Sequence, residues 1–469
     1  MPFVRLAACG SFLLVLMACS LAPQYSRPQS PVPPDFGQEA SSELALPAWQ
    51  DFFREPRLRA LIETSLAENR DLRLAVLNIE AARASMGLAR ADRLPSLEAM
   101  GEKNISGGPE RATVRSYELG LTSMWDLDFF GRLRNLSEAA REQYLAAAQG
   151  ARAARLSLVA QAAEAYLETR LAEEELALTR RTLANWRSSQ AFMEERIISG
   201  QGTLLDLEQA RSQSALAETV LADNEASLKR AENALRLLIG RQDTLTLPPP
   251  WTLVRWEPAE LPANVRSEVL LRRPDILEAE HRLKAAQADI GAARAAFFPS
   301  LSLTGTFGWM SGELNTLVSP AAAGWSFVPR LTLPIFAGGR NRANLELAEV
   351  RSSQAVAAYE KAIQTAFREA ADALGVRPLL ARQYQGQRQY LAIRRRVLEL
   401  AQNRYQSGTV SYLEVLEAQR EVFEAERNLL AVRRSQLLNE IRLYLALGGG
   451  LDDGPRAPGE EPNPDGETA

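Results

Sequence analysis

The feature that most constrains this chain is an internal duplication of two heptad-patterned segments. Residues 196–240 begin RIISGQGTLLDLEQA and end LLIG, and residues 404–450 begin RYQSGTVSYLEVLEA and end ALGGG. A seven-residue repeat kept over several heptads predicts coiled α-helices, here twice in one chain. The matching heptad positions are Leu207, Ser214, Leu221, Leu228 and Leu235 in the first copy and Val415, Val422, Leu429, Gln436 and Leu443 in the second.

The N-terminus has the pattern of an export signal. An apolar run over residues 6–17 is too short to span a bilayer as a mature helix. The sequence LMAC at residues 16–19 resembles the lipobox of bacterial lipoproteins, which implies a signal peptide over 1–18 and a lipid on Cys19. The alternative is a plain signal peptide that contains a cysteine. Cys9, the other cysteine, lies inside the signal, so we expect no disulfide in the mature chain.

A tether is expected between the lipid anchor and the first helix, over residues 19–55. It is rich in proline to about residue 48 and shows no periodicity, so we expect it to run extended along a surface. By analogy with bacterial lipoproteins, Ser20 after the cysteine permits transport to the outer membrane.

Each half of the chain repeats one order of elements. The first repeat, 56–240, is expected to contain a helix over 56–93, strands over about 95–103 and 114–128, and a long helix to about residue 199. The second repeat, 267–447, is expected to contain a helix over 274–296, strands over about 299–310 and 325–335, and a long helix to about 407 with a kink or break at 375–378. A proline-rich linker at 241–266 joins the repeats, and a disordered tail at 448–469 ends the chain.

The expected strands alternate between apolar and polar residues. In the second strand the pattern places Leu119, Leu121, Met124 and Trp125 mainly on the apolar face. A half-buried strand of a soluble protein gives the same pattern, so alternation alone favours a membrane barrel only weakly. Four strands are too few to close a barrel alone, so a membrane-spanning sheet of this size must be completed by other chains.

Enzyme and nucleic-acid functions find no support in the residues. The formal net charge is −4, and the chain has no nucleotide-binding loop, no nucleophile motif and no metal-spaced Cys and His cluster. The single histidine, His281, lies on a charged helix and is expected to be solvated. We therefore predict a protein that is not an enzyme and has no catalytic residue, metal, cofactor or nucleic-acid partner.

Several motifs together resemble the TolC-like outer-membrane efflux factors, and most closely their lipoprotein branch. These are LAPQYSRP after the cysteine, the paired LPSL and FPSL, the turns LDFFGR and LPIFAGGR, and RYQSG followed by YLEVLEAQR. The resemblance covers nearly the whole mature chain. It implies a homotrimer with a shared twelve-stranded β-barrel in outer-membrane lipid, four strands per protomer, above a periplasmic α-barrel of long coiled helices. The strand–helix turns would lie at Pro95, Gly131, Pro299 and Gly339.

The resemblance also implies a passive conduit that depends on an inner-membrane pump and a periplasmic adaptor. The adaptor would dock on the helical hairpin tips, at Ser199, Gly200, Ser407 and Gly408. Threefold symmetry would bring tip side chains into rings, in which leucines block water and carboxylates favour cations. The aperture candidates are Leu205, Asp206, Arg404, Tyr405, Tyr412, Leu413, Glu414 and Glu417. Ordinary helix-start acids stabilised by the helix dipole are the alternative for the carboxylates.

Other functions are also compatible with these residues. A type I protein-secretion channel belongs to the same class, and nothing in the residues separates drugs, metals and polypeptides as cargo. The lipoprotein branch favours drugs or other small toxic compounds. A lipid-anchored periplasmic coiled-coil adaptor is a further alternative, but two duplicated pairs of alternating strands argue against it.

Overall fold

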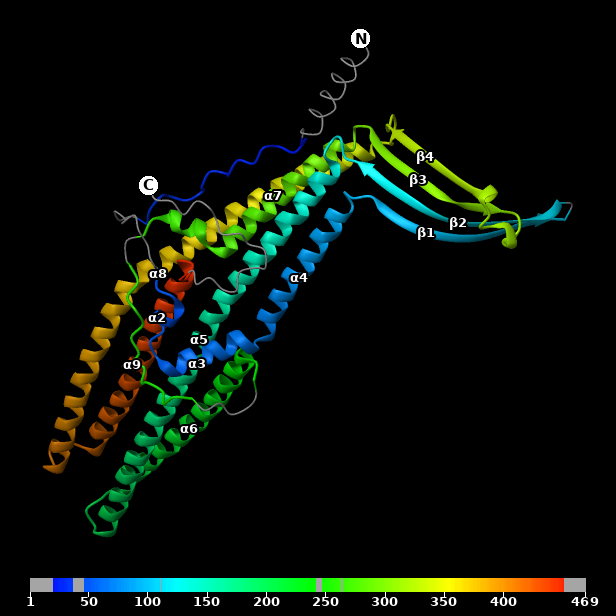
Figure 1. Ribbon diagram of the computed structural model, residues 1–469. Helices are drawn as coiled ribbons and strands as arrows, with labels where there is room; N and C mark the ends of the chain where they lie inside the picture. The colour runs from blue at the N-terminus through cyan, green and yellow to red at the C-terminus, as the bar shows by residue number, and fades with distance from the viewer. Residues whose placement is uncertain (1–19, 37–45, 110, 242–246, 263–264, 451–469) are drawn as a thin grey trace. The chain divides into compact units, whose positions relative to one another are not determined.

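The computed structural model describes residues 20–36, 46–109, 111–241, 247–262 and 265–450. This part of the chain is mainly α-helical and contains one four-stranded antiparallel sheet (Figure 1). The residues form two compact units. The first comprises residues up to 30, 76–150 and 275–362, and the second comprises 31–75, 151–274 and 363 onward. Each unit therefore takes a part from both halves of the duplication.

The sheet of the first unit is built by four strands that pair in chain order. They are β1 (Ser96–Gly108), β2 (Arg111–Leu127), β3 (Ser300–Ser311) and β4 (Ala323–Thr332). β1 runs past its expected end at 103, because it stays paired with β2 up to an irregularity near the hairpin. β4 ends before its expected limit at 335, where Pro334 has no N–H for a ladder bond. β1 and β4 are the edges, and the described chain supplies no strand beyond either.

The strand register gathers the large apolar side chains on one face of the sheet. Leu121 lies opposite Phe307, and Phe307 lies opposite Trp325, so the three point to the same side. Met124 was expected with this set but lies on the other face, because its partners across the ladder are Ser96 and Thr304. The apolar face includes Leu97, Leu119, Leu121, Trp125, Leu127, Leu301, Leu303, Phe307, Trp309, Trp325, Phe327 and Leu331.

Four helices contribute to the first unit. They are α4 (Arg70–Ala91) from residue 76, α5 (Arg132–Ile198) to residue 150, α7 (Pro274–Ala295) from residue 275, and α8 (Arg340–Gln406) to residue 362. α5 and α7 pack through the small buried side chains of Ala139, Ala285 and Ala288. None of the described helices combines the length and the apolar character needed to cross a membrane.

The second unit is built around two antiparallel helical hairpins (Figure 1). One joins the rest of α5 to α6 (Leu204–Ile239), and the other joins the rest of α8 to α9 (Tyr412–Ala446). The hairpins pack on each other through Trp186 of α5 and Phe423 of α9, whose ring centroids lie 5.6 Å apart. The short helices α2 (Trp49–Phe52) and α3 (Pro56–Glu68) and a 3-10 helix, η1 (Ser267–Arg272), complete the unit. The two coiled hairpins agree with the duplicated heptads.

The helix expected over 56–93 is divided at Asn69. The Asn69 backbone is extended, with φ −65° and ψ 132°. Its carboxamide oxygen accepts a hydrogen bond from the N–H of Leu72 at 2.9 Å, which caps the start of α4. Its amide group donates to the carbonyl of Leu238 at the end of α6, also at 2.9 Å. The single side chain therefore satisfies backbone groups of two helices, and the break makes both bonds possible.

The break or kink expected at 375–378 is not a break, because α8 continues through Pro378. Proline removes one backbone donor from the helix, and the helix is continuous on both sides of it. The side chain of the neighbouring Arg377 holds this turn of α8 through bonds outside the helix backbone. Its Nε lies 2.9 Å from Glu440, and its Nη1 donates to the carbonyl of Leu261 at 2.8 Å.

Arginines fasten the described part of the linker, 247–262, to the second unit. Arg170 of α5 donates to the carbonyl of Trp251. Arg433 of α9 donates to the carbonyls of Leu253 and Trp256, at 3.0 and 2.7 Å. A guanidinium offers several donors in a fixed plane, so one side chain can hold two carbonyls of an irregular segment. With Arg377 of α8, arginines from three helices, α5, α8 and α9, thus hold the backbone of residues 247–262, which we call the strap.

Glu55 is the buried carboxylate beneath this strap, with 0% of its surface exposed. It accepts hydrogen bonds from the hydroxyl of Tyr166 at 2.6 Å and from the N–H of Trp251 at 2.9 Å. Its Oε2 finds no hydrogen-bond partner among the described residues. Burial raises the pKa of Glu55, and the two hydrogen bonds and the charge of Arg170 offset only part of that effect.

We expect Glu55→Gln to raise the melting temperature relative to the wild type more at pH 7.5 than at pH 4.5. A raised folded-state pKa means that the folded protein binds the proton more tightly, so this stabilisation is present at low pH and is lost as pH rises through the folded pKa. The Gln carbonyl keeps both accepted hydrogen bonds. Thermal unfolding in detergent at the two pH values measures the difference, with Glu63→Gln on the exposed side of α3 as the control. An equal shift at both pH values would contradict the expectation.

Candidate functional site: the hairpin tips and the N-terminal clamp

The two hairpin tips of the second unit turn at the glycines predicted from the sequence. Gly200 and Gly408 have φ of 73° and 75°, a region that favours glycine. Their turns close in the same way, because the N–H of Gln201 bonds to the carbonyl of Arg196 and the N–H of Thr409 bonds to that of Arg404. The predicted docking residues Ser199, Gly200, Ser407 and Gly408 are all exposed.

Both tips share one apolar core, so they form one structural region of the second unit. Met193 and Leu207 from the first hairpin pack with Ala401, Tyr412 and Leu416 from the second. Residues that are matched by the duplication meet here, because Leu207 and Val415 belong to the same cluster. One pair of the heptad positions identified from the sequence, Leu207 and Val415, therefore contributes to the core that joins the two hairpins.

The aperture candidates divide into exposed and buried residues. Leu205 is 67% exposed and Leu413 is 44% exposed, so both are available to a neighbouring subunit or to the solvent. Tyr412 is 3% exposed and lies in the shared core, so its side chain supports the tip from within. Asp206 and Tyr405 are partly buried, and Arg404, Glu414 and Glu417 are exposed.

The charged candidates have different local partners. Arg404 and Glu414 approach to 3.9 Å across the second tip, as expected for a charge pair there. The N–H of Asp206 donates to the Thr203 hydroxyl at 3.1 Å, and the Thr203 hydroxyl donates to the Asp206 carboxylate at 2.7 Å. Asp206 therefore serves as a residue of the helix start, the alternative role expected for a tip carboxylate. Glu417 lines a surface groove of about 740 Å³ between the two hairpins.

Arg196 is a tip residue that the sequence analysis did not identify. Its Nη1 donates to the hydroxyl of Tyr405 at 2.7 Å, and its Nη2 donates to the carbonyl of Gln201 at 3.0 Å. The guanidinium also lies over the Tyr405 ring, 5.3 Å from its centroid. Burial raises the pKa of Tyr405, while the charge of Arg196 opposes that effect. Tyr405 was expected to bond to neighbouring acids, and its partner is this cation of the other hairpin.

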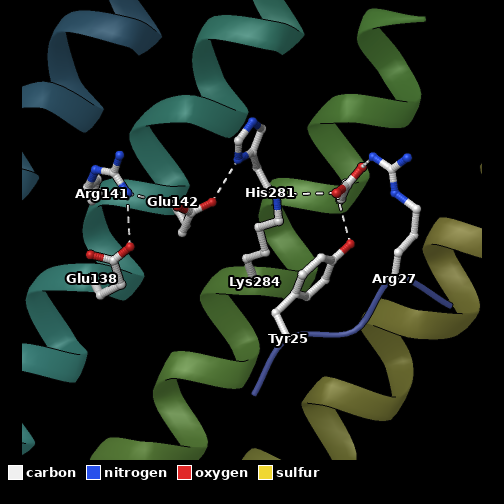
Figure 2. A network of polar contacts seen from close by, with 8 residues as sticks. Tyr25, Arg27, Glu138, Arg141, Glu142, His281 and Lys284 are labelled. Atoms are coloured by element: carbon white, nitrogen blue, oxygen red, sulfur yellow. Dashed lines mark hydrogen bonds and ion pairs between the residues drawn. The ribbon is translucent and has the colours of Figure 1, made fainter. Parts of the chain in front are cut away.

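The first unit contains a second arrangement of charged groups, which clamps the N-terminal segment. The carboxylate of Glu280 on α7 accepts from the Tyr25 hydroxyl at 2.8 Å and from Arg27 at 2.6 Å (Figure 2). Lys284 lies 3.2 Å from the same carboxylate and 4.9 Å from the centroid of the Tyr25 ring. Burial alone would raise the pKa of Glu280, but the bonds from Tyr25 and Arg27 and the charge of Lys284 hold it below its usual range.

The segment nearest the predicted lipid anchor is held just as closely. The Ser20 hydroxyl donates to the Asn135 side chain of α5 at 2.9 Å, and Arg294 of α7 donates to the carbonyl of Leu21. A Cβ on Gly291 would lie 2.8 Å from the backbone nitrogen of Ala22, so the segment fits only against a glycine. Cys19 itself lies outside the described residues.

His281 is not simply solvated, which corrects the expectation from its charged surroundings. Its Nδ1 lies 2.7 Å from the Glu142 carboxylate of α5, and 18% of the His281 side chain is exposed (Figure 2). Glu142 also bonds to Arg141. The histidine therefore links α7 to α5 within the clamp region, which a sequence cannot reveal because the partner lies 139 residues away.

The predicted strand–helix turns form equivalent pairs in the two halves. Pro95 and Pro299 directly precede β1 and β3. Gly131 and Gly339 have φ of 75° and 85° directly before α5 and α8. Two non-equivalent turns also touch across the halves, since the ring of Phe130, beside Gly131, stacks on that of Phe298, beside Pro299, with centroids 4.8 Å apart. Within the described residues, no group of three or more His, Cys, Asp or Glu side chains is placed to hold a metal ion.

Comparison with known proteins agrees with this architecture. A family model described as "Outer membrane efflux protein" matches residues 61–241 and 265–449, one match for each half. The cation efflux system protein CusC of Escherichia coli K12 is 43% identical over 93% of the chain and 97% of its own length. The probable outer membrane lipoprotein SilC of Salmonella typhimurium is 42% identical over 94% of the chain and 97% of its own length. The crystal structure of the open state of the Neisseria gonorrhoeae MtrE outer membrane channel matches with a TM-score of 0.86 and 38% identity, over 92% of this chain and 99% of that one.

Proposed function

Because the chain belongs to the outer membrane efflux protein family, we propose that it is the outer-membrane channel subunit of a tripartite efflux system. The observation that carries the proposal is a sheet with one apolar and one polar face, joined in the same chain to two long helical hairpins. The apolar face suits lipid and the polar face suits a water-filled path. Small toxic compounds, including cations, would pass through it from the periplasm to the exterior without chemistry.

The working channel is a homotrimer in this proposal. Each chain offers four strands with the edges β1 and β4 left for other chains, so three copies would give twelve strands. A sheet edge exposed to lipid leaves backbone groups unpaired, and closure by neighbouring copies removes that cost. The helices of the three copies would complete the periplasmic tunnel.

Cys19 is the proposed lipid anchor, and the clamp on residues 20–27 would position it against α5 and α7. We expect Cys19→Ala to abolish incorporation of labelled palmitate, because the thiol that takes the lipid is gone. Cys9→Ala is the matched control and should keep the label, since Cys9 lies in the signal peptide. Label that persists in Cys19→Ala would remove Cys19 as the anchor.

The hairpin tips are the proposed periplasmic aperture and docking surface. Leu205, Leu413, Arg404, Glu414 and Glu417 would face the aperture, with Asp206, Tyr405 and Tyr412 supporting them from partly or fully buried positions. The exposed turns at Ser199, Gly200, Ser407 and Gly408 would meet a periplasmic adaptor, which couples the channel to an energised inner-membrane pump.

Single-channel conductance in planar bilayers, combined with the oligomer mass in detergent, tests the proposal. Discrete conductance steps from a trimeric particle are the expected result. A monomer that leaves the bilayer silent would contradict both the trimer and the conduit.

A further inference from the structure

The apolar face of the sheet carries positive charge at one end. Lys103 on β1 and Arg115 on β2 lie on this face, because the register alternates in step from the pair that Leu121 makes with Ala99. The acidic residues of the described strands all lie on the polar face. They are Glu98, Glu102, Glu118 and Asp126. Among the described strand positions, the apolar face therefore carries positive charge and no negative charge.

The two cations are close enough to bind one ligand. Lys103 lies opposite Tyr117, and Arg115 lies opposite Ile105, so the cations are diagonal neighbours on adjacent strands. Such neighbours are about 7 to 8 Å apart, which long side chains can bridge. The Lys103 Nζ lies 5.5 Å from the centroid of the Tyr117 ring. Both cations are exposed, and neither has an ion-pair partner among the described residues.

Protection of a sheet edge accounts for only one of these charges. A lysine on an edge strand discourages pairing with foreign chains, and β1 is an edge of this sheet. Arg115, however, lies on β2, which is an inner strand. In the proposed trimer β1 would be paired with a neighbouring copy as well. A cation on a surface that faces lipid is costly at the centre of a bilayer and tolerated near its interface.

The register places the two cations at the border of the apolar band. The same-face positions of β2 from Leu127 to Tyr117 span ten residues, or about 34 Å at roughly 3.4 Å per residue. At a strand tilt of about 40°, this length gives a height of about 26 Å, close to the apolar band of about 25 Å in membrane barrels. Trp309 and Tyr117 lie in the last two rows, as aromatic residues do at a membrane interface. Arg115 lies one row further, at the level of lipid head groups.

This end of the sheet carries the β1–β2 hairpin and lies away from the helices of the first unit (Figure 1). In the proposed channel the helices extend into the periplasm, so the hairpin end faces outward. The outer leaflet of an outer membrane consists of lipid A, an acylated sugar that carries phosphate groups. A guanidinium binds two phosphate oxygens with its planar fork, and an ammonium adds a point charge.

We propose that Lys103, Arg115 and Tyr117 form a binding site for a phosphate group of lipid A on the lipid-facing surface of the sheet. The acyl chains would lie along the apolar face, beside Leu119 and Leu121. The choice of lipid A rests on the proposed function, which sets the outward end of the sheet. The recognition of phosphate rests on the three side chains alone. One phosphate would neutralise both cations and so remove the cost of charge beside lipid.

Native mass spectrometry of the detergent-purified protein, titrated with lipid A, measures this binding. Lys103→Gln/Arg115→Gln should bind lipid A about 25-fold more weakly than the wild type, since each basic residue near an anionic lipid contributes a factor of about five. Lys229→Gln/Arg230→Gln removes the same two charges from the exposed surface of α6 and is the matched control. It should bind as the wild type does. Equal affinity of the wild type and Lys103→Gln/Arg115→Gln would overturn the proposal.

Two further probes test the ligand with the wild type alone. Lipid A from which the phosphates have been removed should bind as weakly as lipid A binds to the double variant, and equal affinity for both lipids would refute the phosphate site. Inorganic phosphate at the concentration of the lipid should not displace lipid A, because the free ion gains nothing from the apolar face. Full displacement would show a site for the free ion and contradict the lipid.

The conductance measurement keeps this inference separate from the channel proposal. A wild type that is silent in bilayers, but binds lipid A through Lys103 and Arg115, would refute the channel and leave the phosphate site. A conducting trimer that binds lipid A no better than the double variant would refute the phosphate site and leave the channel.

Discussion

Replacing Gly240 with alanine should destabilise the protein by about 2 to 5 kcal/mol. Gly240 ends α6 with φ of 76°, and its added Cβ would lie 2.5 Å from the carbonyl oxygen of Glu68. The left-handed backbone costs a residue with a Cβ about 1 to 2 kcal/mol, and forced displacement of packed backbone costs about 1 to 3 kcal/mol more. Asn69, whose amide holds the carbonyl of Leu238, would have to move as well.

Gly408→Ala is the matched control for this prediction. Gly408 has nearly the same φ, 75°, but a Cβ there meets nothing within 4 Å. The control should therefore show only the backbone term, about 1 to 2 kcal/mol. Denaturant or thermal unfolding in detergent measures both variants. If the two variants lose the same free energy of unfolding, the contact with Glu68 does not contribute to the effect of Gly240→Ala.

Replacing Arg196 with alanine should increase the open probability of the channel about tenfold. The side chain joins the two hairpin tips through its bond to Tyr405, and a hydrogen bond to a charged group contributes about 1.5 to 3 kcal/mol. Losing about 1.4 kcal/mol that favours a closed arrangement changes the ratio of closed to open channels by a factor of about ten. Single-channel recording measures that ratio directly.

Arg211→Ala is the control for the tip prediction. Arg211 pairs with Glu208 and Glu194, all within the first hairpin, so its loss leaves the link between hairpins intact. Tyr405→Phe should reproduce most of the Arg196 effect, because it removes the accepting hydroxyl and keeps the ring. An unchanged open probability in both Arg196→Ala and Tyr405→Phe would show that this bond does not hold the tips closed.

The elements could be predicted because they follow from local periodicity. The heptads predict the two helices α6 and α9 and place Leu207 and Val415 in their shared core, and the alternation of β2 and β3 predicts most of their faces. Glycine at the hairpin turns was predictable for the same reason, since Gly200 and Gly408 occupy a backbone region that other residues avoid.

The polar contacts could not be predicted, because each joins residues that are distant in the chain. Arg196 and Tyr405 are 209 residues apart, and Tyr25 and Glu280 are 255 apart. A charged residue on a helix carries no local sign of its partner, which is why His281 was expected to be solvated. Met124 was assigned to the wrong face because two adjacent apolar residues cannot both follow a period of two.

The open edges of the sheet also predict which mutant alleles are dominant over the wild type. β1 and β4 run in opposite directions, so copies joined edge to edge continue the antiparallel alternation, and in the proposed trimer every copy is needed to close the ring. A subunit with an impaired β1 edge would prevent closure of the barrel in every trimer that contains it. With equal amounts of normal and impaired chains, only about one trimer in eight would contain normal subunits alone. Such an allele is expected to be dominant over the wild type, whereas an allele that prevents folding altogether would be recessive.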